Sequence, residues 1–130
     1  MVEAKATEAA LELLKARPGE LARRLAAFHK GEVIGGDLQD LQLRYMTGTW
    51  TGKNRLKGLL PEGTPVAHKT GTSLTVNGRT GATNDAGIIS LPNGKHAVVV
   101  VFVSDSEASQ QEREQTIARI ARAVYDARGK

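Results

Sequence analysis

The sequence predicts an α+β fold: N-terminal helices, then a three-stranded antiparallel sheet, then a C-terminal helix packed on the sheet. Two observations indicate this class. Apolar residues recur at helical spacing through the first 60 residues and again near the C-terminus. Between these parts, apolar runs of strand length are separated by Asn-Gly and Pro-Asn-Gly, which are typical turn signals.

Four segments of the first half have helical character. Residues 4–17 and 20–30 each place Leu and Ala on one face, and Pro18-Gly19 separates them. Residues 38–46 follow Asp37, a residue type that commonly caps helix N-termini. A shorter helical piece is expected over 53–60, where Pro61 ends it. We therefore expect residues 1–61 to form a helical segment.

The second half, residues 62–130, is expected to hold the sheet and the last helix. Strands are predicted over 64–69, 86–91 and 96–104. The third strand is apolar throughout 98–103, which is typical of a strand covered on both faces. A helix is predicted over 107–128, and its buried stripe comprises Ile117, Ile120, Ala121 and Val124. The outer strands of such a small sheet would have open edges.

Composition narrows the function classes. The 130 residues suffice for one domain, and their 40% hydrophobic and 25% charged content is ordinary for a globular protein. There is no cysteine, which excludes disulfides and thiolate metal ligands. No apolar run approaches the ~20 residues of a membrane helix. The net charge of +4 is spread along the chain without interleaved aromatic residues, so a solvated basic surface is favoured over nucleic-acid binding.

The segment from Pro65 to Ser73 holds the clearest chemical signal. Lys69 brings a positive charge and Thr70 and Thr72 bring hydroxyl donors, which together suit the recognition of a carboxylate. Gly71 lies among them and lets a ligand approach the backbone because it has no Cβ.

Several motifs in this order resemble those of class A serine β-lactamases. They are Thr51-Gly-Lys-Asn-Arg-Leu-Lys-Gly-Leu-Leu-Pro-Glu-Gly63, Val66-Ala-His-Lys-Thr-Gly-Thr72, Ala82-Thr-Asn-Asp-Ala-Gly-Ile-Ile89 and Leu91-Pro-Asn-Gly-Lys95. The resemblance is closest to an extended-spectrum subgroup of that family, which also carries a histidine directly before Lys-Thr-Gly. The resemblance is close over 32–128 and implies that residues 1–130 form a single, partial β-lactamase-like domain corresponding to the C-terminal half of the enzyme.

The resemblance also implies roles for individual residues. Lys69 and Thr70 would bind the carboxylate of a β-lactam, together with Gly71. Thr72 would donate its backbone N–H to the oxyanion hole and offer its hydroxyl to the substrate, and Ser73 would line the same strand edge. Asn84-Asp85 would have a structural role and tie the second strand to its surroundings. The alternative, a polar turn with a capping Asp, predicts nearly the same role for these two residues. For Arg55 and Arg79 a solvated side chain is favoured over contact with the substrate carboxylate. The family needs no cofactor and no metal.

The catalytic serine of that family has no counterpart in this sequence. Class A enzymes use Ser-x-x-Lys, Ser-Asp-Asn and a glutamate that positions water. No lysine follows three residues after any of the serines at Ser73, Ser90, Ser104, Ser106 and Ser109. The only Ser-Asp continues with Ser106 instead of Asn. We therefore expect the chain to be inactive alone, and whether it should be classed as an enzyme stays open.

Other chemistry is not favoured. His29, His68 and His96 fall on a predicted helix, strand and hairpin, and each is expected to be an ordinary surface or packing histidine. The main hypothesis is a β-lactamase portion that acts on a β-lactam only when complemented by the missing half. The alternative is a non-catalytic β-lactamase-derived scaffold that self-associates through its open strand edges, with nucleic-acid binding ranked last and no membrane partner expected.

Two further points follow from the resemblance. The family is exported, so a periplasmic or secreted location is expected, although the sequence shows no signal peptide pattern. The family also has one helix where this chain offers two, 4–17 and 20–30. An internal duplication and foreign sequence joined at a fragment boundary both explain the additional helix.

Overall fold

The computed structural model describes residues 17–130 and confirms the α+β class. The expected helix over 4–17 lies outside the described residues except for Arg17, which is the N-cap of the next helix. In chain order the elements are α2 (Pro18–His29), α3 (Gly36–Gly48), β1 (Val66–Thr72), β2 (Thr75–Val76), β3 (Arg79–Ser90), β4 (His96–Ser106) and α4 (Gln110–Arg128). Within this part of the chain, no helix is both long and apolar enough to cross a membrane.

The sheet is antiparallel, with β3 at its centre. β1 pairs with one edge of β3 in the register Thr70↔Asp85, and β4 pairs with the other edge in the register Asp85↔Val101. The two-residue strand β2 pairs with the beginning of β3. The three predicted strands are thus confirmed, and β2 is a fourth that the sequence did not predict, because two exposed residues carry no periodic signal.

Both predicted turns are present. Asn77 and Gly78 have φ angles of 49° and 76°, so this left-handed pair closes the tight hairpin between β2 and β3. The loop between β3 and β4 is closed by the Leu91 N–H, which donates to Lys95 O at 2.9 Å. Gly94 in that loop has a φ of 78°, a conformation that glycine adopts without strain.

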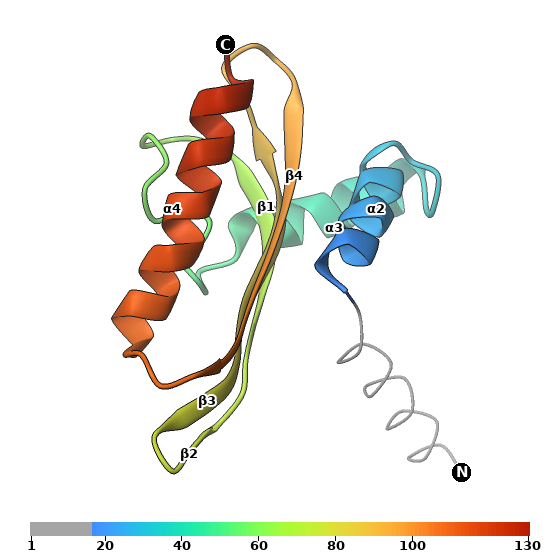
Figure 1. Cartoon of the computed structure of the whole chain (residues 1–130). Coiled ribbons are helices and arrows are strands. Elements are labelled where there is room, and N and C mark those ends of the chain that lie inside the picture. Colours follow the sequence, from blue (N-terminus) through green and yellow to red (C-terminus); the bar gives the residue numbers. More distant parts are fainter. Residues whose placement is uncertain (1–16) are drawn as a thin grey trace, which may run out of the picture.

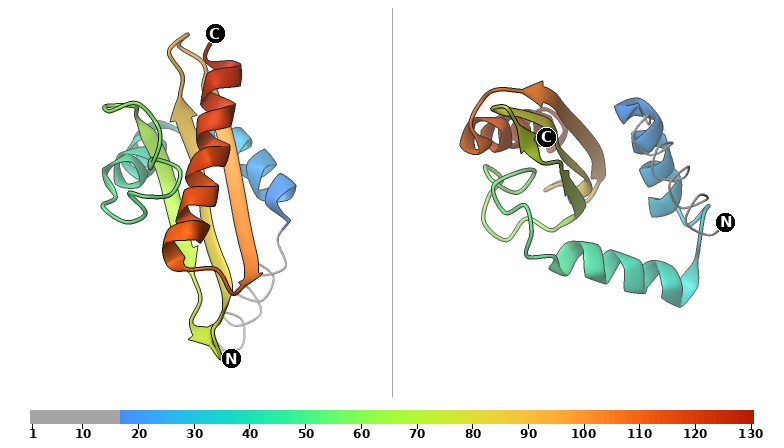
Figure 2. Two further views of the ribbon diagram at one scale, coloured as in Figure 1. Left: turned by 60° about the vertical axis from the view of Figure 1, so that its left-hand side comes forward. Right: turned by 90° about the horizontal axis from the view of Figure 1, so that it is seen from below.

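Helices lie on both sides of the sheet, as Figures 1 and 2 show. α4 runs along one face, where its Ile117 and Ala121 join Val99 and Val101 of β4 in the hydrophobic core. α2 contacts β4 and β3, and α3 contacts β1, from the opposite side. The apolar strand β4 is therefore contacted by α4 on one face and α2 on the other, which accounts for its continuous run of apolar residues.

Each predicted strand is longer in the structure. β1 extends through Gly71 and Thr72, so Lys-Thr-Gly lies inside the strand and not at its end. β3 begins at Arg79, seven residues before the expected start, and includes Asn84-Asp85, which is therefore not a turn. Polar and glycine residues hid these extensions, because their pairing depends on the neighbouring strand and not on their own propensity.

Several predicted helix features are wrong. Residues 53–60 form successive turns and not a helix, with hydrogen bonds such as Gly58 N–H to Arg55 O spanning three residues. Gly35, and not Asp37, is the N-cap of α3. α4 begins at Gln110 because Ser109 and Glu112 form a reciprocal capping box there. That capping hydroxyl is the main reason that the pKa of Glu112 is lowered.

Several exposed apolar residues lie on α3 and near it, while others, such as Leu74 and Val76, lie around β2. Leu38, Leu41 and Tyr45 of the predicted α3 stripe are 66%, 43% and 71% exposed, and α3 has no buried residue. Trp50, directly after α3, is 88% exposed. In the predicted α4 stripe, Ile117 and Ala121 are fully buried, Val124 is partly buried against the core, and Ile120 is 41% exposed. The apolar face of α3 thus lacks a covering element among residues 17–130.

Candidate functional site

The Lys-Thr-Gly strand has one free edge. Among residues 17–130, β1 pairs with β3 alone and has no strand on its other side. The Ser73 N–H donates to Ala82 O of the β3 segment at 3.0 Å. Because successive residues of a strand point their N–H groups to opposite sides, the N–H of Thr72 points toward the open edge. A Cβ at Gly71 would meet no atom within 4 Å, so the strand is also open above this glycine.

The structure brings five predicted site residues together but gives them different surroundings. Lys69, Gly71, Thr72 and Ser73 are exposed, and Thr70 is half-buried. The Lys69 Nζ donates to Thr70 O at 2.6 Å. The Ser73 hydroxyl accepts the Ala82 N–H at 2.8 Å and donates to Leu74 O at 3.2 Å. Ser73 therefore secures the strand ending, whereas the ammonium group of Lys69 lies at the surface.

A hollow of about 500 Å³ lies beside this strand, between β1, the segment after α3 and the start of α4. Thr70 and Thr72 face it from β1, and their partners across it are hydroxyl and guanidinium groups. The Thr70 hydroxyl donates to Thr51 Oγ1 at 3.3 Å. The residues that line the hollow are Trp50, Thr51, Gly52, Lys53, Asn54, Arg55, Thr70, Thr72, Gln110 and Glu114. The hollow thus combines a polar floor with one exposed indole at its margin.

Arg55 is the main polar link below the hollow, and the expectation of a solvated side chain is wrong for it. The residue is 5% exposed and pairs with Glu114 of α4, with Nε 3.2 Å from Oε1. Its guanidinium also donates to Gly71 O at 3.1 Å, to Asn84 O at 2.7 Å and to the Thr72 hydroxyl. This one side chain therefore joins β1, β3 and α4. Arg79 is exposed, as expected, and pairs with Glu107 at 2.7 Å.

The sequence contained no sufficient signal for the Arg55–Glu114 pair. The two residues are 59 positions apart, and each belongs to a stretch with several other charged residues. Arg55 stands next to Leu56, which is fully buried, and only this neighbour hints at an inward orientation. The pairing follows from how the turns over 53–60 pack against α4.

The histidines occupy two places. His68 is 1% exposed in the sheet, where its Nδ1 lies 2.9 Å from both carboxylate oxygens of Asp85. His29 of α2 and His96 of β4 come together instead of lying apart, with ring centroids 4.3 Å from each other. Burial, and then the charge of His96, lower the pKa of His29. Within residues 17–130, no group of three His, Cys, Asp or Glu residues could hold a metal ion.

Comparisons with known proteins define the family. Residues 1–128 match the family described as Beta-lactamase enzyme family. The extended-spectrum β-lactamase PER-1 of Pseudomonas aeruginosa is 48% identical over 104 residues, which are 80% of this chain and 34% of PER-1. A solved TLA-3 extended-spectrum β-lactamase is 48% identical with a TM-score of 0.87, over 88% of this chain and 42% of that one.

A further solved structure specifies the class. A representative of class A β-lactamase from Bacteroides cellulosilyticus DSM 14838 is 37% identical with a TM-score of 0.85, again over 88% of this chain and 42% of that one. The chain therefore belongs to the class A β-lactamase family. It spans about a third of the length of the curated relatives it matches.

Proposed function

We propose that this chain supplies the substrate-carboxylate anchor and one oxyanion-hole donor of a class A β-lactamase. Lys69 and Thr70 bind the carboxylate of the β-lactam, and Gly71 lets the substrate approach the strand. The outward N–H of Thr72 donates to the oxygen that becomes charged when the ring amide is attacked, and Ser73 lines the edge. The observation that carries the proposal is the free edge of β1, which presents these groups side by side.

Hydrolysis of the ring through an acyl-enzyme requires more than these groups. Acyl transfer needs an activated nucleophile and a base as well as the oxyanion site. The 130 residues contain no Ser-x-x-Lys and no Ser-Asp-Asn. The chain is accordingly inactive by itself and acts on β-lactams only with a complementing segment that carries the serine. By family, the location is the periplasm or the exterior of the cell.

Exposed apolar residues and an unpaired strand edge on the surface of the described part of the chain support the binding of such a complementing segment. Leu38, Tyr45 and Trp50 are each more than 60% exposed, on or next to one helix. Exposed apolar residues that gather in this way typically mark an interface. The N–H and C=O groups at the outer edge of β4 also lack a strand partner within residues 17–130. Both features suit a second polypeptide segment seated against the sheet and α3.

Complementation tests the proposal. The chain is mixed, or co-expressed, with the part of PER-1 that lies outside the matched region, and hydrolysis of a chromogenic cephalosporin is measured. We expect hydrolysis from the mixture and none from either part. Lys69→Ala should raise KM at least about tenfold, because a charge-assisted hydrogen bond contributes ~1.5–3 kcal/mol. Lys95→Ala, in the exposed β3–β4 loop, is the matched control. A folded mixture without hydrolysis contradicts the proposal.

A self-associating, non-catalytic module is the second candidate. The edges of β1 and β4 that have no strand partner among residues 17–130 favour it, because exposed strand edges pair with other copies. Light scattering on the isolated chain distinguishes the two candidates. A monomer of 13.9 kDa contradicts self-association, whereas a stable dimer that complementation does not dissociate contradicts the enzymatic proposal.

A further inference from the structure

A buried histidine lies directly before Lys69, and its hydrogen bond determines which nitrogen carries the proton. His68 is 1% exposed and Asp85 is fully buried. The His68 Nδ1 lies 2.9 Å from Oδ1 and from Oδ2 of Asp85. Because an ionised carboxylate only accepts hydrogen bonds, the proton belongs on Nδ1. In the part of the chain that the structure describes, no group bonds Nε2, which suits an unprotonated nitrogen.

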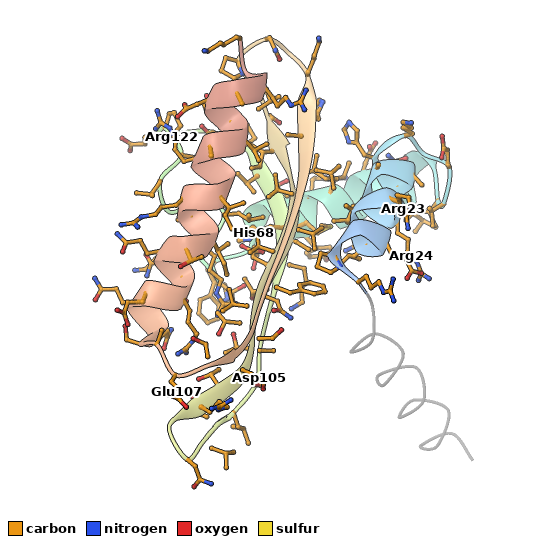
Figure 3. The ribbon with its side chains drawn as sticks, viewed as in Figure 1. Arg23, Arg24, His68, Asp105, Glu107 and Arg122 are labelled. Carbon is orange, nitrogen blue, oxygen red and sulfur yellow. The ribbon has the colours of Figure 1, made fainter. Side chains whose placement is uncertain are left out.

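The carboxylate of Asp85 is itself fixed from two sides. Its Oδ2 accepts the backbone N–H of Leu56 at 3.2 Å, which ties it to the turns after α3. In the sheet register, Asp85 is the partner of Thr70. The His68 ring therefore bonds to a carboxylate that is fixed to both β3 and the 53–60 turns. His68 itself lies two residues before Thr70 on β1. Figure 3 places His68 near the middle of the sheet.

The imidazole also approaches the turn that carries Thr51, through Cε1, the carbon between its two nitrogens. A Cβ built on Gly52 would lie 3.3 Å from His68 Cε1 and 2.3 Å from Thr70 Cγ2. The Gly52 backbone thus packs against both side chains, and its φ of 68° is a conformation that favours glycine. Thr51, next to it, accepts the hydrogen bond of the Thr70 hydroxyl. The imidazole fills the space between Asp85 and this turn.

We propose that His68 is a positioning residue for carboxylate recognition. Held by Asp85 through Nδ1–H, its ring supports the Thr51–Gly52 turn and so fixes the orientation of the Thr70 hydroxyl beside Lys69. This inference rests on the proposed role of Lys69 and Thr70. The carboxylate contact is made in the ground state and the transition state alike, so disturbing it raises KM and leaves kcat nearly unchanged.

Two substitutions separate this role from simple packing. The amide nitrogen of Asn lies near the position of the imidazole Nδ1, whereas that of Gln lies near Nε2. His68→Asn therefore keeps the bond to Asp85, and His68→Gln loses it. In the complemented enzyme we expect KM to rise about tenfold in His68→Gln and about threefold in His68→Asn, with kcat within about twofold. His96→Gln, at an exposed histidine of β4, is the control and leaves both unchanged.

Nuclear magnetic resonance provides a readout that needs no activity. In the ¹⁵N-histidine-labelled chain, alone or with the unlabelled complement, one histidine should show the Nδ1–H tautomer with slow solvent exchange. That signal should disappear in both His68 variants and persist in His96→Gln. In uniformly ¹⁵N-labelled chains, the amide resonances of Thr70 and Thr51 should shift more in His68→Gln than in His68→Asn.

Each result bears on one proposal or the other. An Nε2–H tautomer for His68, or unshifted Thr70 and Thr51 resonances in His68→Gln, overturns the positioning role. An unchanged KM in an active His68→Gln complex also overturns the positioning role. An equal rise in KM in the Asn and Gln variants overturns it as well. Absence of hydrolysis from the wild-type mixture instead contradicts the proposed function, and the resonance measurements still decide whether His68 orients Thr70.

Discussion

Removing the guanidinium of Arg55 should destabilise the fold far more than removing an exposed one. Arg55→Met keeps most of the buried length of the side chain but leaves the Glu114 carboxylate, which is 11% exposed, without its cation. Breaking a buried ion pair by removing one partner costs ~3–5 kcal/mol. Asn54 and Gln110 still donate to Glu114 at 3.5 Å and 3.3 Å, so we expect the lower end, about 3 kcal/mol.

The matched control is Arg79→Met. The side chains of Arg79 and Glu107 are 55% and 70% exposed, and such pairs contribute about 0–1 kcal/mol. Free energies of unfolding come from urea titrations followed by far-ultraviolet circular dichroism. Adding Glu114→Leu to Arg55→Met should recover part of the loss, because no unpaired carboxylate then remains buried, although the bonds of Arg55 to Gly71 O, Asn84 O and Thr72 stay lost. Equal, small losses in the two arginine variants, or no recovery in the double variant, would refute the reasoning.

Three further predictions use the same titrations. Gly52→Ala should lower the free energy of unfolding more than Gly63→Ala. Both glycines have positive φ, so both substitutions bring a strain of ~1–3 kcal/mol, but only at Gly52 would the new Cβ clash, 2.3 Å from a threonine methyl of β1. Equal costs would contradict this contact. Ile117→Ala should cost ~2–5 kcal/mol because Ile117 is fully buried, and Ile120→Ala, at a 41% exposed position, should cost less than half as much. The lowered pKa of His29 means that the unfolded chain binds its proton first, so stability is complete above about pH 6.5 and falls as the pH drops through and below that value. His29→Gln should flatten this slope between pH 7.5 and 5.5, and an unchanged slope would contradict the assignment.

The parts of the fold that were predictable from the sequence have local causes. The Asn77-Gly78 and Pro92-Asn93-Gly94 turns and the amphipathic α4 follow from φ preferences and helical periodicity, and the structure confirms all three. The missed features have non-local causes. Gly71-Thr72 and Asn84-Asp85 are strands because of pairing across the sheet: Gly71 lies opposite Asn84, and Asn84-Asp85 also pairs with β4.

The same distinction applies to the site. Lys-Thr-Gly could be recognised because its chemistry is contiguous in sequence. Arg55, Asp85 and Glu114, which surround it, lie on separate segments, and one ordinary charged residue does not reveal its partner 17 or 59 positions away. Burial decides such partners, because a charge inside the fold must find a counter-charge or hydrogen bonds. Only the assembled fold therefore shows that the strand is held from beneath.

The internal support of β1 leads to a conclusion about how the activity is divided. The Arg55 bonds to Gly71 O and Thr72, and the Asp85 bond to His68, are all made by residues of this chain. The anchor strand is thus shaped before any complementing segment arrives. Under the proposed function, that segment would supply the serine but would not need to build the carboxylate site. Loss of Arg55 should accordingly weaken complementation through the shape of β1, whereas loss of Lys69 should leave the assembled complex intact and impair only its binding of β-lactams.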